Sequence, residues 1–204
     1  GGMGLSLIEF SQISSILGSS PIGLYLFNCQ APDAGNMEIL IEYGTKYQKD
    51  KFLKPLLEGK IRSCFSMTEP NHAGSNPVFM STTAIKKNDS YLINGRKWYT
   101  SSAEGSSFAI VMAISNPNEK NKYLTASQII VPTDLKGFNL IRKIPVMGEE
   151  GEGYFSHSEI EYNNVTVPKE NLLGKEGFGF KIAQSRLGPG RIHHCMRWIG
   201  ICER

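Results

Sequence analysis

The sequence predicts an α+β fold in which an antiparallel β-sandwich or β-barrel lies between two helical regions. Apolar residues recur at helical spacing before Ser63 and again after Gly179, whereas the stretch between these points holds short strand-like runs. Several strands without intervening helices favour an antiparallel domain over a parallel nucleotide-binding sheet. We therefore divide the chain into part of an amino-terminal helical domain (1–62), a central β-domain (63–173) and the beginning of a carboxy-terminal helical domain (174–204).

The predicted helices follow from apolar residues at helical spacing. Thr45 is a plausible N-cap for one of them, and Gly59 is its plausible terminator. After Gly179 the helical pattern returns, and Gly188-Pro189-Gly190 is expected to interrupt or kink that helix. The expected amino-terminal elements are helices at 5–17, 37–43 and 46–57, with an apolar segment at 22–29 and a loop at 31–36.

Strand-forming runs separated by polar, glycine or proline turns fill the central region. Between two of them stands Asn94-Gly95, the strongest local signal for a two-residue hairpin turn. This turn would set Ile93 opposite Arg96. The predicted strands are 79–87, 91–93, 96–101, 108–114, 126–131, 138–144 and 158–167.

Aromatic and hydroxyl residues alternate in the strand after Gly95. Because successive side chains of a strand point to opposite faces, Trp98 and Thr100 are expected on one face and Tyr99 and Ser101 on the other. Each face then offers an aromatic ring and a hydroxyl, which suits a flat heteroaromatic ligand. From the residues alone, such aromatic side chains are more often part of a core than of a ligand platform.

The stretch from Cys64 to Asn76 is a second candidate binding segment, because a short strand there runs into a turn rich in small residues. Backbone N–H groups freed by such a turn, with the Thr68 and Ser75 hydroxyls, form a donor surface suited to a phosphate or a ring carbonyl. The glycine-rich run 174–179 lacks both the strand–helix frame and the lysine-serine pair of a phosphate loop. We interpret that run as an interdomain turn.

Composition narrows the function classes. The 204 residues carry 22 basic and 19 acidic side chains, a net charge of +3, without the blocks of like charge typical of nucleic-acid-binding proteins. We therefore expect no nucleic-acid partner and interpret the locally basic run 46–60 as a solvated helix face. No apolar run is long enough to span a bilayer, so no transmembrane segment is expected.

Cysteine and histidine usage predicts no metal site. The four cysteines are scattered, and we interpret them as reduced thiols of an intracellular protein. His193-His194-Cys195 occupy consecutive helix positions, which point about 100° apart and cannot converge on one ion. The run Gly1–Gly4 carries no signal-peptide features, and Arg204 falls inside a helical pattern, so we expect a chain truncated at both ends.

Two ordered blocks carry a family resemblance: Phe65-Ser66-Met67-Thr68-Glu69-Pro70 followed by Gly74-Ser75, and Gly95-Arg96-Lys97-Trp98-Tyr99-Thr100-Ser101. The first resembles the flavin-binding signature of the acyl-CoA dehydrogenase family, and the second resembles its second flavin segment. The run 188–197 resembles the subgroup represented by members 10 and 11 of that family. Further similar blocks at 44–59, 167–174 and Gly179-Phe180 extend the resemblance over nearly the whole chain.

The resemblance implies FAD as the cofactor, with backbone and hydroxyl groups at Met67 and Thr68 meeting the pyrimidine edge of its ring. Aligned without gaps from Gly95, Tyr99 takes the flavin-stacking position and Ser101 the hydroxyl position near N5. Trp98 and Thr100 are the alternative pair. The implied FAD contacts are Phe65, Met67, Thr68, Gly74, Ser75, Tyr99, Thr100 and Ser101, and the implied substrate contacts are Ser75 and Arg191.

The first segment departs from the family pattern at two positions. One extra residue stands between Pro70 and the Gly74-Ser75 pair, which leaves Ala73 as a competing alignment. Asn76 stands where the family usually has an aspartate.

The implied reaction is α,β-dehydrogenation of an acyl-CoA thioester, in which a glutamate takes the α-proton and the β-hydride passes to flavin N5. In a minority of the family that glutamate directly precedes the arginine matching Arg191, but here the position is Gly190. Glu69 belongs to the binding motif and is a poor substitute, so the base is expected beyond Arg204 and this chain is expected to be inactive alone.

The resemblance further implies an electron-transfer flavoprotein as electron acceptor and assembly into a homodimer or homotetramer. A role in fatty acid β-oxidation and a mitochondrial or peroxisomal location are expectations from the subgroup. Two alternatives stay open: a flavin oxidase or monooxygenase of the same fold, and a non-catalytic module that binds CoA or flavin.

Overall fold

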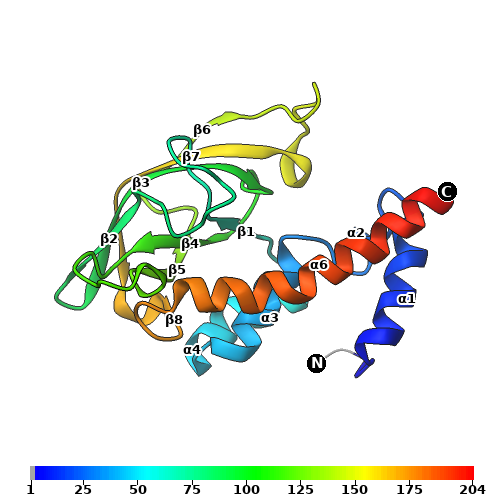
Figure 1. The fold of residues 1–204 in the computed structure, drawn as a ribbon, viewed down its shortest axis with the longest axis horizontal. Coiled ribbons are helices and arrows are strands. Elements are labelled where there is room, and N and C mark those ends of the chain that lie inside the picture. Colours follow the sequence, from blue (N-terminus) through cyan, green and yellow to red (C-terminus); the bar gives the residue numbers. More distant parts are fainter. Residues whose placement is uncertain (1–2) are drawn as a thin grey trace.

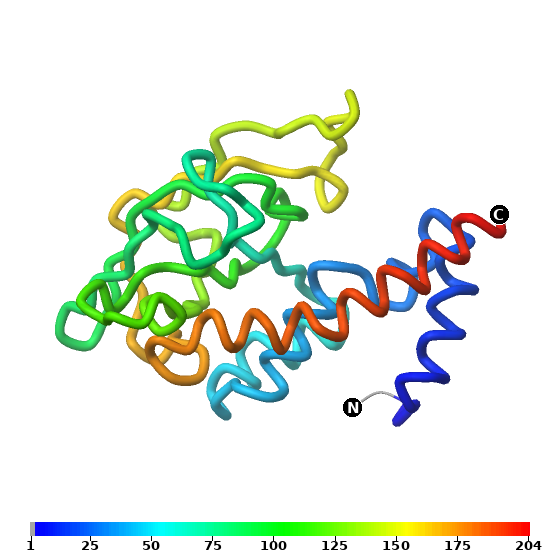
Figure 2. Tube along the Cα trace, in the orientation of Figure 1, coloured from blue at the N-terminus to red at the C-terminus, as the bar shows by residue number. Residues whose placement is uncertain are grey.

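The computed structural model describes residues 3–204, and Gly1 and Gly2, at the start of the predicted amino-terminal domain, lie outside the described residues. A β-sheet forms one part of the molecule, and the helices lie along one side of it (Figure 1). The last helix, α6 (Gly179–Glu203), runs from the sheet to α1 (Leu7–Gly18) at the opposite end. Helix α1 and the carboxy-terminal end of α6 therefore lie away from the sheet (Figure 2).

Side-chain caps begin two of the helical segments. Ser6 and Glu9 form a reciprocal capping box at the start of α1. Thr45 caps α4 (Lys46–Gln48) together with Gln48, as its sequence position predicts. The remaining helical elements are α2 (Gly23–Leu26), α3 (Asp33–Tyr43), the π-helical η1 (Lys49–Leu53), α5 (Lys54–Leu57) and the 3₁₀ turns η2 (Lys122–Leu124), η3 (Gly153–Phe155) and η4 (Lys169–Asn171).

Two helix predictions were wrong. The predicted loop 31–36 instead contains the start of α3, where the Asp33 carboxylate accepts hydrogen bonds from the backbone N–H and hydroxyl of Ser63. Tertiary bonds thus fix a turn that local propensity does not favour. The predicted interruption of the last helix is absent: α6 continues as one helix through Pro189, which has no N–H to donate to the Ser185 carbonyl. Its packing against α1, α3 and β5 (Ala126–Pro132) supports the helix across the proline.

Within residues 3–204, eight strands form one mixed sheet in the order β6-β7-β3-β2-β4-β5-β8, with β1 beside β4. The β1–β4 and β2–β4 pairs are parallel, and the other pairs are antiparallel, so the β-domain is an open, mostly antiparallel sheet with β6 and β8 at its ends. The predicted α+β fold is confirmed. The prediction that all strands pair antiparallel was wrong, because two of the pairs are parallel. The strands are β1 (Ser63–Ser66), β2 (Thr83–Lys87), β3 (Ser90–Ser101), β4 (Phe108–Ile114), β5, β6 (Phe138–Lys143), β7 (His157–Pro168) and β8 (Leu172–Leu173).

The predicted hairpin at Asn94-Gly95 was wrong. The turn lies at Asn88-Asp89, and β3 runs through Asn94-Gly95 as one strand with a bulge at that point. Asn94 accepts a hydrogen bond from the Asn164 backbone N–H on β7. The continuous strand is favoured over a hairpin because it pairs with the long strand β7 along most of its length. A hairpin at Asn94-Gly95 would lose that pairing. Strand β2 is also shorter than expected, because the Ser81 and Thr82 N–H groups donate to the Glu69 carboxylate.

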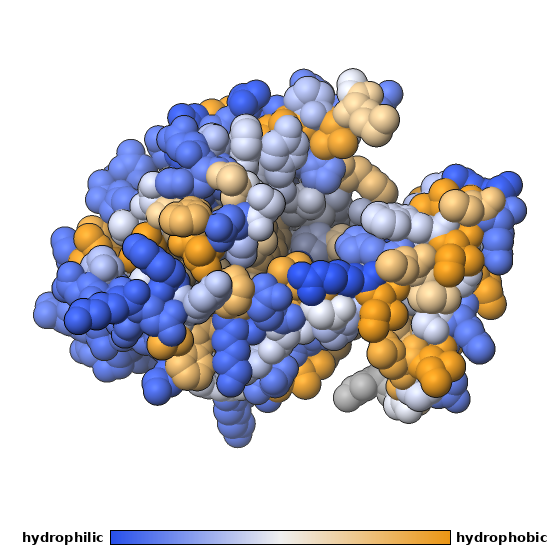
Figure 3. All heavy atoms as spheres, in the orientation of Figure 1, coloured by the Kyte–Doolittle hydropathy of each residue, from blue (hydrophilic) through white to orange (hydrophobic). Residues whose placement is uncertain are grey.

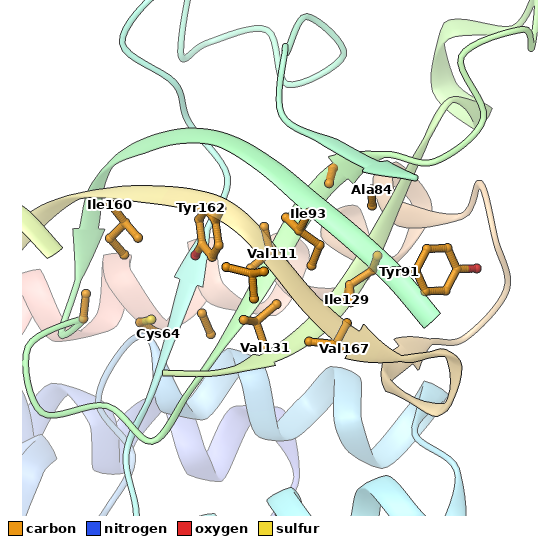
Figure 4. Packing of buried hydrophobic residues seen from close by; sticks show 14 residues of the cluster. Cys64, Ala84, Tyr91, Ile93, Val111, Ile129, Val131, Ile160, Tyr162 and Val167 are labelled. Carbon is orange, nitrogen blue, oxygen red and sulfur yellow. The ribbon is translucent and has the colours of Figure 1, made fainter. Parts of the chain in front are cut away.

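Strand β4 lies at the centre of the core, because both of its faces are buried. Ala109, Val111 and Ala113 pack into the sheet core, in which Figure 4 shows Val111, Ile93 and Tyr162 turned toward one another. Phe108 and Ile110 pack on the other side, against α3, α5 and α6. This double burial explains why β4 is apolar throughout instead of alternating.

None of the helices in residues 3–204 has the length and apolar character needed to cross a membrane.

The Tyr162 hydroxyl predicts a measurable stability contribution. It is fully buried and donates to Ser66 Oγ at 2.8 Å, and Ser66 in turn lies 3.3 Å from Thr100 Oγ1. Y162F should lower the free energy of unfolding by about 1–3 kcal/mol, because it deprives buried Ser66 of a partner. Urea denaturation measures the change. The matched control Y123F removes the hydroxyl of an exposed tyrosine and should change the free energy by less than about 0.5 kcal/mol. Equal effects of the two substitutions would contradict the prediction.

Candidate functional site

A cleft lies where strands β3 and β7 meet the α2–α3 loop and helix α6; we call it the sheet–helix cleft. Three of the predicted site residues, Phe65, Tyr99 and Ser101, line it. Its remaining lining residues are Tyr25, Ala31, Pro32, Ser102, Tyr154, Phe155, His157, Arg186, His194 and Arg197. Aromatic rings and cationic side chains thus surround one concave space.

A bulge in β3 decides which side chains face this cleft. Pairing with β7 shifts between Lys97 and Thr100, and Tyr99 has a positive φ of 47°. Lys97 and Thr100 are both fully buried although they are three positions apart, so strict alternation breaks between them. Tyr99 and Ser101 nevertheless line the cleft together, as their predicted shared face requires. The bulge turns the Tyr99 ring outward, where it is 47% exposed, while Trp98 packs edge-on against it.

Thr100 points away from the cleft. Its side chain is fully buried, and its hydroxyl lies against Ser66 in the interior. Thr100 was predicted to contact the flavin together with Tyr99 and Ser101. The Thr100 hydroxyl, however, cannot reach a ligand in the cleft, because the bulge places it on the core side of β3.

The Ser101 hydroxyl has a partner that sequence reasoning missed. His157 Nδ1 lies 2.7 Å from Ser101 Oγ, and the two residues are cross-strand neighbours on β7 and β3. Both line the sheet–helix cleft. Their separation by 56 positions in the sequence left no local signal for this pair.

Phe65 and Arg186 connect the cleft to the helices. The Arg186 guanidinium lies 4.2 Å from the centroid of the Phe65 ring and donates to Asn36 Oδ1 and to the Pro32 carbonyl. Burial lowers the pKa of Arg186 to about 10, although Glu38 and Asp33 oppose the shift. Arg186 thus places a positive charge beside the cleft at neutral pH.

The predicted substrate residue Arg191 lies elsewhere. It is exposed on α6 and lines a second cavity between α1, α3 and α6, together with Glu38 and Gly190. The cations that reach the sheet–helix cleft are Arg186 and Arg197. Arg191 thus does not line the sheet–helix cleft, although the two cavities share Arg186, His194 and Arg197.

Met67 and Thr68 join the two candidate segments by paired contacts. The Trp98 N–H donates to the Thr68 carbonyl at 3.0 Å, and the Thr68 hydroxyl donates to the Trp98 carbonyl at 2.9 Å. The Thr68 oxygen keeps lone pairs that can accept a hydrogen bond. Met67 is half-buried against Met80 and Met112.

Gly74 and Ser75 are exposed on the loop that follows. A Cβ built on Gly74 would lie 3.3 Å from Thr68 Cγ2, so the loop passes directly over Thr68. Ala73 is exposed on the same loop, and its competing alignment stays open.

A buried ion pair holds the two segments together, and the sequence analysis did not identify it. Lys97 Nζ lies 2.8 Å from both Glu69 Oε1 and the Met67 carbonyl oxygen, and the lysine side chain is 0% exposed. Burial lowers the pKa of Lys97 to about 8, against the opposing effect of Glu69. Burial alone would raise the pKa of Glu69, but Lys97 and the hydrogen bonds from Ser81 and Thr82 hold it below its ordinary value.

Comparisons with known proteins agree with this geometry. The chain superposes on butyryl-CoA dehydrogenase from Megasphaera elsdenii with a TM-score of 0.83 and 30% identity, covering 98% of this chain and 51% of that one. The fold and its cleft thus define the β-domain and adjoining helices of an acyl-CoA dehydrogenase-type fold. The sequence profile described as "Acyl-CoA dehydrogenase, middle domain" matches residues 64–165, half of the chain. The chain belongs to the acyl-CoA dehydrogenase family.

Its curated relatives are longer than the chain. It is 47% identical over 201 residues to acyl-CoA dehydrogenase family member 11 of Gallus gallus, which covers 98% of this chain and 26% of that protein. It is 48% identical over 204 residues to the probable acyl-CoA dehydrogenase FadE2 of Mycobacterium tuberculosis, covering 98% of this chain and 49% of that protein. The chain therefore spans about half of one relative and about a quarter of the other.

Among residues 3–204, no cluster of histidine, cysteine and carboxylate residues is arranged to hold a metal ion.

The Lys97–Glu69 pair predicts strong energetic coupling. K97M should lower the free energy of unfolding by about 3–5 kcal/mol, because it leaves the Glu69 carboxylate buried without its counter-charge. The double variant E69Q/K97M should lose less than the sum of the two single variants, with a coupling of about 0.5–3 kcal/mol. Urea denaturation of the four proteins measures the cycle. Additive losses would contradict an energetically coupled pair.

The lowered pKa of Glu69 predicts a loss of stability in acid. A carboxyl group whose pKa is lowered in the folded state stabilises it above the ordinary value of 4.5 and loses that contribution as the pH falls through the folded value. E69Q cannot titrate at this position. The difference in unfolding free energy between the natural protein and E69Q should therefore shrink between about pH 6 and about pH 3. A difference that stays constant over this range would contradict the assignment.

Proposed function

We propose that this chain forms the flavin-facing part of an FAD-dependent acyl-CoA dehydrogenase, which carries out α,β-dehydrogenation of an acyl-CoA thioester. Membership of the family supports the reaction class. The observation that carries the proposal is the bulge in β3, which turns Tyr99 and Ser101 together into the sheet–helix cleft. An aromatic ring and a hydroxyl side by side suit the flat, hydrogen-bonding edge of a flavin.

The residues present fit a flavin in their donor chemistry. Tyr99 and Phe65 offer aromatic surface in the cleft, and Ser101 offers a hydroxyl there. Thr68 lies outside the cleft lining, but its hydroxyl oxygen, which donates to the Trp98 carbonyl, keeps lone pairs for a ligand. At Gly74 a side chain would press against Thr68, so glycine keeps the approach to Thr68 open. The structure of PigA with FAD and proline, which matches 100% of this chain with a TM-score of 0.85 and 25% identity, adds support for FAD as the cofactor.

Each side chain then has a distinct role in the proposed reaction. Bound FAD supplies the hydride acceptor. The Tyr99 ring covers one side of the space and excludes water, and the Ser101 hydroxyl offers an orienting hydrogen bond. Behind Thr68, the Lys97 ammonium donates to the Met67 carbonyl and polarises the peptide whose N–H belongs to Thr68. That N–H becomes a stronger donor toward negative charge that develops nearby.

Glu69 is unsuited to act as the base. Its carboxylate is 4% exposed and already accepts hydrogen bonds from Lys97, Ser81 and Thr82. Gly190 leaves no carboxylate at the alternative position on α6. We therefore propose that the α-proton goes to a glutamate outside residues 1–204.

Partners and assembly are further parts of the proposal. Apolar side chains gather over α1 and the outer end of α6 (Figure 3), including Ile8, Ile16, Trp198 and Ile199. A surface of this kind supports contact with other protein segments, as in a homodimer or homotetramer. An electron-transfer flavoprotein as acceptor, a role in fatty acid β-oxidation and a mitochondrial or peroxisomal location remain proposals that rest on the family alone.

One alternative has a specific observation in its favour. The solved PigA structure contains FAD and proline on a similar fold, so this fold also accommodates a small molecule that is not an acyl-CoA. A flavin oxidase or monooxygenase of the same fold is therefore the second candidate. It would reduce its flavin with a different substrate and reoxidise it in air.

The visible flavin spectrum of the full-length protein tests the proposal. Recorded anaerobically, the oxidised band should bleach on addition of at least one member of a panel of saturated acyl-CoAs. Y99L should weaken FAD binding about threefold to tenfold, because an aromatic contact contributes about 0.5–1.5 kcal/mol. The control Y123L changes an exposed tyrosine outside the cleft and should leave binding unchanged. A bound flavin that no acyl-CoA reduces would favour the oxidase alternative, and a protein without flavin would refute both.

A further inference from the structure

His157 stands out among the residues of the sheet–helix cleft because it contacts the predicted cofactor-facing hydroxyl directly. We propose that His157 is a positioning residue that fixes the orientation of the Ser101 hydroxyl toward a bound flavin. The inference rests on the proposed function. Its basis in the structure is the 2.7 Å contact between His157 Nδ1 and Ser101 Oγ.

The backbone holds the imidazole in place. His157 is the first residue of β7 and the register partner of Ser101 on β3, so the two side chains share one face of the sheet. The His157 carbonyl accepts a hydrogen bond from the Ile144 N–H at 2.7 Å, and the preceding Ser156 carbonyl accepts one from the Ser102 N–H at 3.0 Å. Both sides of the histidine backbone are thus tied to neighbouring segments, which keeps the His157 backbone beside Ser101.

A serine hydroxyl needs such a partner in order to present a defined group to a ligand. It has one proton and two lone pairs, and it rotates freely when nothing holds it. A neutral imidazole can donate from Nδ1 or accept at Nδ1, according to its tautomer. When Nδ1–H donates to Ser101 Oγ, the serine proton is free to donate into the cleft; when Nδ1 accepts that proton, a serine lone pair faces the cleft instead.

These two arrangements match the two forms of a flavin ring nitrogen. An unprotonated ring nitrogen needs a donor, and a protonated one needs an acceptor. The Ser101–His157 pair can meet either need by rotation of one hydroxyl together with the corresponding imidazole tautomer. No hydrogen bond within residues 3–204 occupies His157 Nε2, so the second ring nitrogen is free to gain or lose a proton as the tautomer changes. His157 therefore lets one serine serve the oxidised and the reduced ligand.

Variants of the full-length protein test this role through flavin binding and reduction potential, without reliance on turnover. H157L removes both hydrogen-bonding nitrogens. It should change the ratio of the affinities for oxidised and reduced flavin about threefold to tenfold, the effect expected for one hydrogen bond. H157N keeps a polar group near the Nδ1 position and should remain within about twofold of the natural protein. The readouts are the reduction potential of the bound flavin, measured against a reference dye, and the dissociation constant of FAD.

A double-variant cycle separates a positioning role from a general structural one. In an S101A background, H157L should have no further effect on the potential, because its route of action is gone. S90A serves as the matched control: Ser90 is on the same strand, and its hydroxyl donates to the Lys87 carbonyl far from the cleft. S90A should leave the potential unchanged.

Three results would overturn the proposal. The first is an H157L variant whose ratio of affinities for oxidised and reduced flavin, calculated from the reduction potential, stays within about twofold of that of the natural protein. The others are an equal effect of H157L with and without the Ser101 hydroxyl, and an H157N variant that behaves like H157L. Each of these leaves the proposed dehydrogenase function standing, provided that acyl-CoA still bleaches the flavin. A natural protein that holds no flavin would overturn both inferences together.

Discussion

The buried contact between Lys97 and Glu69 is the interaction on which the site depends. It joins the loop that follows β1 to the middle of β3, two segments that lie 28 positions apart. A lysine with no exposed surface is costly to bury, and its charge is compensated here by one carboxylate and by the Met67 carbonyl. Loss of that compensation would leave a buried ammonium without its counter-charge, which destabilises the fold.

The bulge in β3 follows in part from this contact. Lys97 must point into the core toward Glu69, and Thr100 must point into the core toward Ser66. Strict alternation would place these two residues on opposite faces, because they are three positions apart. One extra residue between them reconciles both contacts, and Tyr99 takes the left-handed backbone conformation that this requires. The outward direction of the Tyr99 ring is thus a consequence of how the core is packed.

Local signals predicted the elements whose causes are local. Thr45 caps its helix with Gln48, and most strands of the β-domain lie where apolar and β-branched runs indicate them. The predictions that failed concern residues whose partners are distant. Asn94-Gly95 has the composition of a hairpin turn but accepts and donates hydrogen bonds with Asn164 on β7. Pairing between β3 and β7 is invisible to a reading of neighbouring residues.

The same distinction applies to the candidate site. Of the residues that the motifs proposed, Phe65, Tyr99 and Ser101 line the cleft, because each stands in a recognisable run, whereas Thr68 lies outside the lining. His157 and Arg186 were missed, since each joins the cleft from a distant element and stands in no such run. Alternation placed Tyr99 and Ser101 on one face but left open which pair faces a ligand, and the ungapped alignment from Gly95 selected the pair that lines the cleft.

The floor of the cleft is fixed by a polar junction where three separate parts of the chain meet. Asn36 on α3 donates to Ser63 Oγ and to the Cys64 carbonyl on β1, and its side-chain oxygen accepts from Arg186 on α6. A fully buried asparagine therefore uses both ends of its amide to align a helix, a strand and a second helix. Arg186 on α6 stacks on Phe65 of β1, so the aromatic ring and the positive charge beside the cleft both depend on α6 packing against the sheet. The cleft thus combines residues of the sheet with residues of the helices, and neither set alone would line it.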